Sequence, residues 1–368
     1  MVSSQNLAKS IVRGSLRPKE AEVVLISTYP HTIELAEQVA LECQKAGADP
    51  ALWLDTDGLF YGQFKNYSTE SLHRVSGHCV GLLDYVNSYI WLNGPRDPSP
   101  MRTVPGEKFA AMFEGEKAHY DKMFAKMPKN VAVAIGQVTR ERAKTYGFNY
   151  ARWKAMIEAA SVVNPERLES HGELVAGLLS HPVDVRLTAD NGTKLKFRLA
   201  GAERKPYVHD GVISDEDLAV GTLASRSVDL PTGEVGIAAV EESANGTFVA
   251  DVPVPIRGRL VEGLSWTFRN GKVTEFTAKK NVALAQTNWE EATGRKDMFG
   301  GVSFGLNPKA LPGFLQNSIV SGTVGIGIGD NRDAGGANDS SYAFGAPLAH
   351  ATVEIGGKTV IQDGAWTI

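Results

Sequence analysis

The sequence predicts two domains: an α/β domain with a parallel sheet at residues 1–165, and an α+β, mainly antiparallel domain at residues 166–368. The first half alternates buried strands with amphipathic helices, which is typical of a parallel sheet covered by helices. From Pro182 onward the chain changes to short strands separated by turn residues, which is typical of antiparallel sheets. A length of 368 residues accommodates two domains of ordinary size.

The first strands and helices follow one another closely. A short amphipathic helix is predicted at residues 4–13. Residues 21–30 (AEVVLISTYP) form a continuous β-branched run and predict a buried strand. Residues 31–46 have helical apolar spacing, and residues 48–57 predict the next strand. A strand–helix–strand unit this short requires parallel strands joined by a right-handed crossover.

The rest of the first half continues the alternation of strands and helices. Residues 79–94 contain a helix and a strand, residues 107–126 are strongly helical, and residues 130–136 form another short buried strand. Residues 151–180 are helical with an interruption at Asn164-Pro165, which we interpret as the hinge between domains. No GxGxxG follows the first strand and no GxxxxGK[ST] is present, so a nucleotide site is not supported.

Turn signals divide the second half into hairpins. Residues 183–201 alternate apolar and polar side chains on both sides of a turn, and a helix interrupts the strands near residues 281–294. The expected turns lie at Asp190-Asn191-Gly192, Asn245-Gly246, Asn270-Gly271 and Gly356-Gly357.

Composition limits the class of protein. The apolar fraction of 43% and the charged fraction of 22% are those of an ordinary globular protein. A net charge of -4 offers no basic surface for nucleic acid or an anionic membrane, and no apolar run reaches transmembrane length. Cys43 and Cys79, the two cysteines, lack metal-type spacing. We therefore expect a cytoplasmic protein that acts on a small molecule and has neither a nucleic-acid nor a membrane partner.

A glycine-rich stretch, residues 322–345, is the first candidate site. Gly325, Gly327 and Gly329 alternate with β-branched residues, so one face of the predicted strand carries no side chains. A polar loop follows, including Asn338, Ser340 and Tyr342. The bare face is either the floor of a small-molecule site or a surface packed tightly against another backbone.

Glu234, in the segment LPTGEV, is the second candidate. It follows a Pro-Thr-Gly turn, where a loop can present a carboxylate to a cleft. Such a carboxylate serves as a metal ligand or a general base, or is simply a surface acid at a turn.

Several motifs share an order with a known family. LPTGEV and EESANGT, then GLNP at residues 305–308, SGTVGIGIG and GGANDSS resemble the aminopeptidase T/aminopeptidase S family of metallo-aminopeptidases. The 2,5-dihydroxypyridine ring-cleaving dioxygenases look like relatives that share the same scaffold. The resemblance implies an N-terminal α/β domain, a C-terminal β-rich catalytic domain and a homodimer.

The resemblance also implies a metal site, and four of its five ligand positions differ here. Glu234 matches the acid of the family's GEV motif. The family's other ligands fall on Gly301, Gly325, Ala343 and Gly345, which offer no side-chain nitrogen or oxygen. Two-metal hydrolysis needs several such ligands. The iron site of the dioxygenases also relies on C-terminal His and Asp ligands. We therefore expect neither a metal nor another cofactor.

These observations favour a metal-independent hydrolase or lyase that acts on a small amide, lactone or ring-carbonyl substrate. Glu234 is its expected general acid or base, and glycines at ligand positions are expected to leave backbone N–H groups facing the substrate. A metal-dependent aminopeptidase with displaced ligands, a ring-cleaving dioxygenase and a non-catalytic binding protein remain as alternatives. The expected site residues are Glu234, His209 and Tyr342 for catalysis, and Asn338, Gly325, Gly301 and Ser340 for substrate binding.

Overall fold

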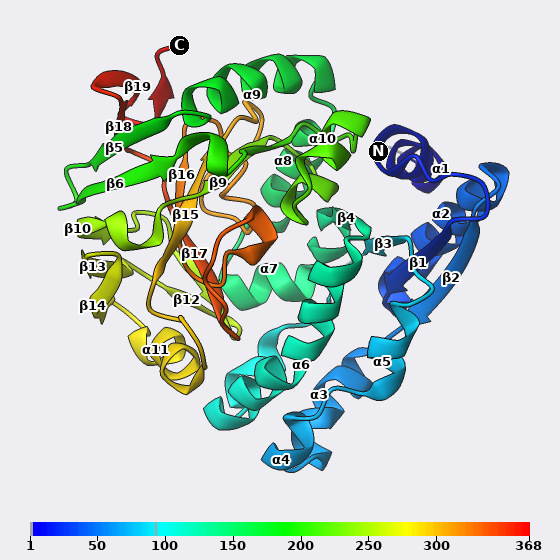
Figure 1. The fold of residues 1–368 in the computed structure, drawn as a ribbon. Helices are drawn as coiled ribbons and strands as arrows, with labels where there is room; N and C mark the ends of the chain where they lie inside the picture. Colours follow the sequence, from blue (N-terminus) through cyan, green and yellow to red (C-terminus); the bar gives the residue numbers. More distant parts are fainter. Residues whose placement is uncertain (1–2, 93) are drawn as a thin grey trace. The chain divides into compact units, whose positions relative to one another are not determined.

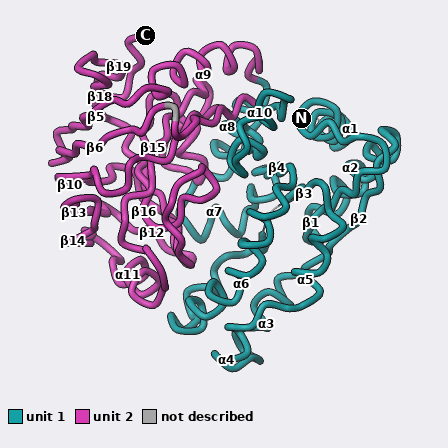
Figure 2. The backbone as a smooth tube through the Cα atoms, viewed as in Figure 1, with its two compact units in different colours: residues 1–162, 211–232 teal, residues 163–210, 233–368 magenta. Residues whose placement is uncertain are grey.

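The computed structural model describes residues 3–92 and 94–368 and divides into two compact units (Figures 1 and 2). Unit 1 contains residues 1–162 and 211–232, and unit 2 contains residues 163–210 and 233–368. The chain first passes from one unit to the other between helices α8 (Tyr150–Ala160) and α9 (Pro165–Leu179). The single sequence boundary at residue 165 lies at this crossing, but it does not separate residues 211–232, which return to unit 1.

Unit 1 is an α/β domain around a five-stranded parallel sheet with the order β2-β1-β3-β4-β8. The predicted parallel sheet is therefore confirmed. The last strand of this sheet, β8, comes from the returning segment. The strands are β1 (Val23–Thr28), β2 (Asp49–Leu54), β3 (Ser88–Trp91), β4 (Lys129–Val133) and β8 (Ser227–Leu230).

Helices cover both faces of this sheet. On one face, Val24 and Ile26 of β1 pack into a core with Ala36 and Val39 of α2. On the other face, Leu25 and Tyr89 form a smaller cluster with helix α5. The helices of unit 1 other than α8 are α1 (Ser4–Lys9), which continues as a π-helix (Ser10–Leu16), α2 (Ile33–Lys45), α3 (Asp57–Asn66), α4 (Thr69–Leu72), α5 (Gly77–Leu82), α6 (Gly106–Lys126), α7 (Arg140–Tyr146) and α10 (Asp215–Val220).

Unit 2 is built from antiparallel sheets, as the turn signals predicted. One sheet has the order β14-β13-β10-β6-β5-β18-β19-β20, another has the order β17-β16-β15-β9-β7, and β11 pairs with β12. Its strands and its second helix are β5 (Pro182–Thr188), β6 (Lys194–Ala200), β7 (Tyr207–His209), β9 (Glu234–Ala238), β10 (Asn245–Val249), β11 (Val254–Ile256), β12 (Arg259–Val261), β13 (Ser265–Arg269), β14 (Lys272–Thr277), α11 (Val282–Glu291), β15 (Phe299–Gly305), β16 (Val324–Gly329), β17 (Ala343–Leu348), β18 (Thr352–Ile355), β19 (Lys358–Gln362) and β20 (Ala365–Trp366).

The turns predicted from the sequence are partly confirmed. Asn270-Gly271 joins β13 to β14 with positive φ at both residues, and Gly356-Gly357 does the same between β18 and β19. The turn expected at Asn245-Gly246 is wrong. Asn245 instead opens β10, where Gly246 pairs with Leu195 on one side and Phe268 on the other.

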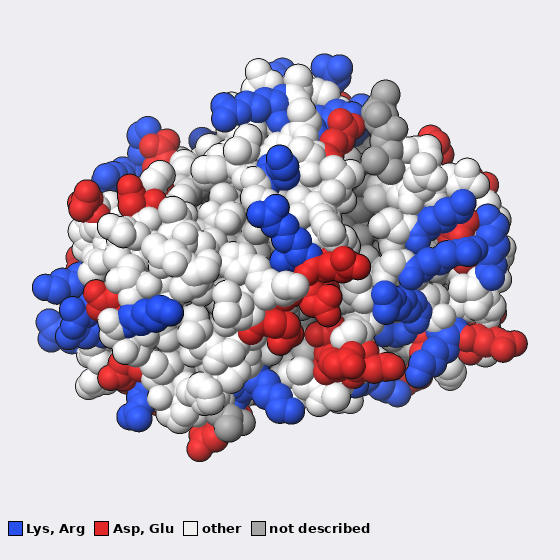
Figure 3. Space-filling model, turned by 90° about the horizontal axis from the view of Figure 1, so that it is seen from above, with Lys and Arg blue, Asp and Glu red and all other residues white. Residues whose placement is uncertain are grey.

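On the face shown in Figure 3, acidic and basic side chains are interspersed. Among residues 3–92 and 94–368, no helix combines the length and the apolar character needed to cross a bilayer.

Candidate functional site

The five-stranded sheet of unit 2 has two unlike faces. One face carries the large apolar side chains that fill the core, among them Val302, Phe304 and Ile326, which are nearly inaccessible to solvent. Successive residues of a strand point to opposite faces, so the residues between them face away from the core. These are mostly glycine, alanine or serine: Gly236, Ala238, Gly301, Ser303, Gly305, Gly325, Gly327, Ala343 and Gly345.

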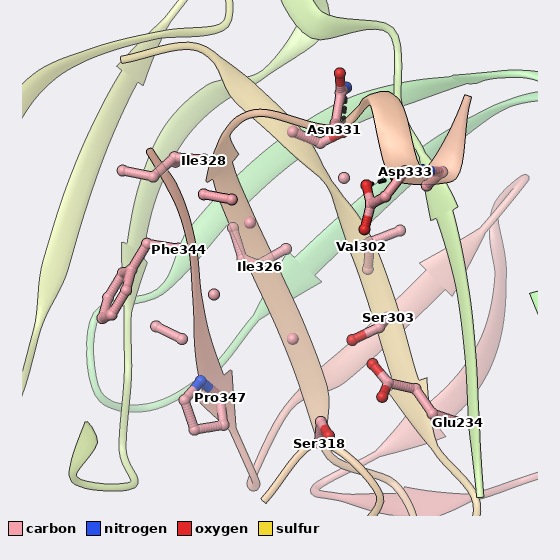
Figure 4. A pocket seen from close by; sticks show the side chains of 18 of the residues that line it. Glu234, Val302, Ser303, Ser318, Ile326, Ile328, Asn331, Asp333, Phe344 and Pro347 are labelled. Carbon is pink, nitrogen blue, oxygen red and sulfur yellow. Dashed lines mark hydrogen bonds between the residues drawn. The ribbon is translucent and has the colours of Figure 1, made fainter. Parts of the chain in front are cut away.

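A cavity of about 420 Å³ lies over this bare face (Figure 4). Its floor is the backbone of β15, β16 and β17, including Gly301, Gly325 and Gly345. Glu234, Asp330 and Asp333 supply carboxylates to its lining, and the carboxylate of Asp330 forms an ion pair of 2.6 Å with Arg332. The sequence left open whether the bare face of the glycine-rich strand is the floor of a small-molecule site or a packing surface. In the structure, Gly325 and Gly327 of this strand line the cavity. Pockets of this size hold small organic ligands.

Side chains from neighbouring strands lie close to two of the glycines. A Cβ atom added at Gly325 would lie 2.5 Å from Oγ of Ser303, its partner across the β15–β16 ladder. A Cβ atom at Gly236 would collide with the hydroxyl and ring of Tyr207, its partner across the β7–β9 ladder. Both Tyr207 and Ser303 line the cavity. The glycines therefore make room for two hydroxyl-bearing side chains.

The backbone of the glycine-rich strand is occupied by the sheet itself. Gly325 and Gly327 of β16 lie between Ser303 and Gly301 of β15 on one side and the residues of β17 on the other. Ladder hydrogen bonds run within the plane of a sheet, so N–H groups at these positions point along it and not into the cavity. The expected row of inward N–H donors is wrong, and polar contacts to a ligand must come from side chains.

Glu234 and His209 come together at one end of the face. Glu234 is the first residue of β9 and pairs with His209, the last residue of β7. A nitrogen of His209 and a carboxylate oxygen of Glu234 lie within 4.8 Å of each other. His209 is buried, and its ring packs against Tyr207 with centroids 4.6 Å apart. Figure 4 shows Ser303 beside the carboxylate of Glu234.

Asp333 belongs to the loop between β16 and β17 and points into the cavity (Figure 4). Its Oδ1 accepts a hydrogen bond of 2.8 Å from the N–H of Ala334. Although the side chain is accessible from the cavity, desolvation by the surrounding protein raises the pKa of Asp333, and the carboxylate of Asp330 adds to this rise. A carboxyl group that holds its proton more tightly is suited to proton donation.

Three of the polar residues expected in the site stabilise the same loop. The Nδ2 of Asn338, which is fully buried, donates to the carbonyl oxygens of Phe299 and Gly329. Ser340 is also buried, and its hydroxyl donates to the carbonyl oxygen of Thr293. The ring of Tyr342 stacks on Phe344, and burial raises the pKa of its hydroxyl. The structure does not place these three side chains in the cavity lining.

Glu241, which follows β9, stabilises the loop between β16 and β17. Its carboxylate is buried and forms an ion pair of 2.8 Å with Arg204. It also accepts hydrogen bonds from Nδ2 of Asn331 at 3.0 Å and from the N–H of Ala337 at 2.8 Å. Burial opposes the ionisation of Glu241, but the hydrogen bonds from Arg204, Ala337 and Asn331 prevail and lower its pKa.

Three lining residues, Asp333, Ser303 and Tyr207, were not among the site residues predicted from the sequence. Asp333 belongs to the polar loop that follows the glycine-rich strand. Ser303 stands two residues after Gly301 and Tyr207 two residues before His209, so strand periodicity alone places each on the face of a predicted site residue. The signal was available once those strands were assigned.

The side chains at the ligand positions implied by the family resemblance do not fit a two-metal site. Gly301, Gly325, Ala343 and Gly345 provide no donor atoms. Position 301 has no room for one, since an added Cβ would lie 2.5 Å from the carbonyl oxygen of Ile237. Within unit 2, Glu234 and His209 are the residues that could still offer ligand atoms near these positions.

Known proteins match this chain in sequence and in fold. Residues 183–307 match the model of the thermophilic metalloprotease family M29. Wild-type AmpT from Thermus thermophilus superposes with a TM-score of 0.73 at 18% identity, over 99% of this chain and 99% of its own. The chain has the aminopeptidase T fold. The 2,5-dihydroxypyridine dioxygenase from Pseudomonas putida KT2440 gives a TM-score of 0.63 at 12% identity, over 100% of this chain and 98% of its own. No curated protein sequence gives a significant match.

The comparisons confirm the resemblance to the aminopeptidase T family and to the dioxygenases. They also confirm the predicted fold class, an α/β unit followed by a mainly antiparallel one. On this fold, the cavity of unit 2 differs from the implied metal site at four of five positions, as described above.

Filling the cavity from its floor should weaken ligand binding without unfolding the protein. An added Cβ at Gly345 meets only the carbonyl oxygen of Ile326, at 3.9 Å, and valine suits a strand. We expect Gly345→Val to raise KM at least tenfold and to leave the melting temperature within about 2 °C of wild type, since the added side chain meets open space. The control is Gly177→Val on α9, where an added Cβ meets nothing within 4 Å. An unchanged KM would show that substrate binds elsewhere.

Proposed function

We propose that the chain is a metal-independent hydrolase that cleaves a small amide, lactone or ring-carbonyl substrate in the cavity of unit 2. The observation that carries the proposal is that two carboxyl groups with unlike surroundings, Glu234 and Asp333, line the same cavity. Glu234 stands beside a buried histidine, whereas Asp333 has a raised pKa. Two titratable groups with different environments are the usual basis of acid–base catalysis at neutral pH.

The roles follow from the surroundings of each group. Glu234, as a carboxylate, accepts the proton of a water molecule that attacks the substrate carbonyl, and His209 orients or shares that proton. Asp333, protonated, donates to the leaving nitrogen or oxygen. The hydroxyls of Ser303 and Tyr207 lie beside the glycine positions 325 and 236 of the bare face, so they are suited to bind the carbonyl oxygen as negative charge develops on it.

The flat floor limits the shape of the substrate. A floor made mainly of glycine accepts a planar group lying on it, such as a ring or a conjugated carbonyl, because few side chains project from it and those are small. Amides and lactones are planar at the bond that is cleaved. A small planar substrate is therefore the class that the cavity fits best.

The proposal is tested by a screen with metal-depleted protein. Protein treated with chelator and dialysed is assayed against panels of small amides, lactones and cyclic imides, and against leucyl and arginyl chromogenic amides, with and without added zinc, cobalt or iron(II). We expect hydrolysis of at least one small substrate at a rate that chelation leaves within twofold, because Glu234 and Asp333 need no metal to exchange protons.

Three results would overturn the proposal in distinct ways. The first is peptidase activity that appears only with zinc or cobalt, together with stoichiometric metal binding that is lost in His209→Ala, Asp229→Asn or Glu234→Gln. This result would establish a metalloenzyme with displaced ligands. Asp229 is included because it is the first carboxylate that precedes Glu234 in the sequence. Oxygen consumption that depends on iron(II) would establish a dioxygenase. Ligand binding without turnover of any panel member would favour a binding protein.

A further inference from the structure

Unit 1 contains a cavity of its own, of about 550 Å³, on the sheet face opposite α1 and α2. Ser27 of β1 lies in its floor, and Trp53 of β2 and Trp91 of β3 are the ladder partners of Ser27 on either side. Neighbouring strands are about 4.8 Å apart, so the two tryptophans start about 10 Å apart with a small residue between them. Tyr89 stacks on Trp91 with centroids 4.2 Å apart. The floor is therefore an aromatic slot.

One stripe of helix α6 faces this slot. The lining residues of α6 are Met112, Gly115, Glu116, His119 and Tyr120, which recur at spacings of three and four. Residues at this spacing share one side of a helix. The stripe therefore places a carboxylate, an imidazole and a phenol in this cavity.

Glu116 is the feature that the known fold does not explain. Among the described residues it makes no hydrogen bond and no ion pair, although it lies in a cavity deep enough for desolvation to raise its pKa to about 7. The Nδ1 atom of His119, one helical turn further along, is buried and has no hydrogen-bond partner among the described residues. Leaving a carboxylate uncompensated in such a place is costly unless a ligand supplies the opposite charge.

The charges around Glu116 favour a cation. Two carboxylates line the cavity, Glu116 and Asp55, and one permanent cation does, Arg74, which is exposed and donates to Ser71. Asp55 accepts hydrogen bonds from Tyr29 and from the N–H of Thr56, so its charge is already stabilised. Aromatic faces attract a positive nitrogen as well.

We propose that this cavity binds a small organic cation, an amine or ammonium group on an apolar or aromatic body. The charged nitrogen pairs with Glu116, and the body lies in the slot between Trp53 and Trp91. Its lining shares no residue with that of the cavity over β15, β16 and β17, and the proposal does not depend on the function proposed for that cavity.

A pair of matched probes tests the proposal with the full-length protein. 2-Phenylethylammonium and 2-phenylethanol have nearly the same size, but only the first carries a charge. Each is titrated at about pH 8 while tryptophan fluorescence is recorded, with calorimetry as the second readout. We expect the cation to bind at least tenfold more tightly than the alcohol, since Glu116 is mostly ionised at this pH.

Glu116→Gln separates the role of the charge from that of the aromatic slot. This variant should lower the affinity for the cation at least tenfold and leave the affinity for the alcohol within twofold. Removing an uncompensated charge should not unfold the protein. Glu107→Gln, an exposed change on the same helix, is the control and should alter neither affinity. Equal affinities for the two probes, no binding of either, or an unchanged cation affinity in Glu116→Gln would each overturn the proposal.

The pH dependence provides an independent check. The cation should bind more weakly as the pH falls from about 8 to about 6, because Glu116 becomes protonated in this range. The other titratable groups that line the cavity are Tyr29, Asp55, Tyr67, Arg74, Cys79, Tyr89, His119 and Tyr120. Of these, His119 would add positive charge at lower pH, which acts in the same direction. Glu116→Gln should flatten most of this dependence, and an equally steep profile in the variant would count against Glu116 as the pairing group.

Discussion

Glu234→Gln is expected to lower kcat between about a hundredfold and ten-thousandfold while KM changes by less than about threefold, because a positioned general acid or base contributes a factor of this size. The amide keeps the size of the side chain and loses its ability to accept a proton. The measurement is steady-state kinetics on the substrate that the screen identifies. Glu234 stands at the end of β9 and lines the cavity, so the change leaves the floor of the site intact.

Two further variants separate catalysis from structure. Glu234→Asp keeps a carboxylate and should retain more activity than Glu234→Gln, whereas a residue needed only for packing would not show this order. Glu275→Gln, an exposed change on β14, is the control and should have no effect. Turnover by Glu234→Gln within twofold of wild type would remove Glu234 from the mechanism.

The pH profile of the wild-type enzyme should be bell-shaped. Glu234 must be ionised to act as a base, so the rate falls at low pH. Asp333 must be protonated to act as an acid, and its raised pKa keeps the proton in place to higher pH than for an ordinary aspartate. The rate therefore falls again as the pH rises through that pKa. In Asp333→Asn the alkaline limb should disappear along with most of the activity, and a retained limb would assign it to another group.

The architecture was predictable because it depends mainly on the local pattern of apolar, polar and turn residues in the sequence. Continuous β-branched runs separated by helices specify the parallel sheet, and Asn270-Gly271 and Gly356-Gly357 take the positive φ values that glycine and asparagine tolerate. Asn245-Gly246 has the same local pattern but opens a strand. There Gly246 is needed because the backbone of Lys194 approaches closely, a contact between residues far apart in the sequence.

The site was predictable only in part, because it depends on strand register. The alternating glycines correctly indicated a bare strand face. Which side chains share that face depends on the pairing of β7, β9, β15, β16 and β17, and this pairing brings Ser303 over Gly325 and His209 beside Glu234. Asn338 was predicted to contact substrate because it is polar and lies in a loop, yet its amide satisfies two backbone carbonyls.

Glu241 shows how the acidic motif after β9 contributes to the site through structure. Because it holds Asn331 and Ala337, it fixes both ends of the loop segment that carries Asp333. Removing one partner of a buried ion pair leaves the other charge uncompensated. Glu241→Gln should therefore lower the free energy of unfolding by about 2–3 kcal/mol, near the lower end for such pairs because the side chain of Arg204 is 15% accessible.

The neighbouring residue provides a matched control. Glu242 pairs with Arg295, but its side chain is 60% accessible, and exposed ion pairs contribute about 0–1 kcal/mol. Urea unfolding at about pH 7 should thus separate Glu241→Gln from Glu242→Gln. Equal effects of the two changes would mean that the ion pair of Glu241 is no stronger than a surface pair.

The loss of unfolding free energy caused by Glu241→Gln should become smaller as the pH falls. The pKa of Glu241 is lower in the folded protein than in the unfolded chain, so its ionised form stabilises the fold above the unfolded pKa of about 4.3. That contribution is lost as the pH falls through the lower, folded value, and the difference between wild type and Glu241→Gln should shrink accordingly. Unfolding of both proteins at about pH 7 and about pH 3.5 measures this change. A difference that stays constant over this range would mean that the carboxylate stabilises the loop by its shape and hydrogen bonds, and that its charge has little part in holding Asp333 over the cavity.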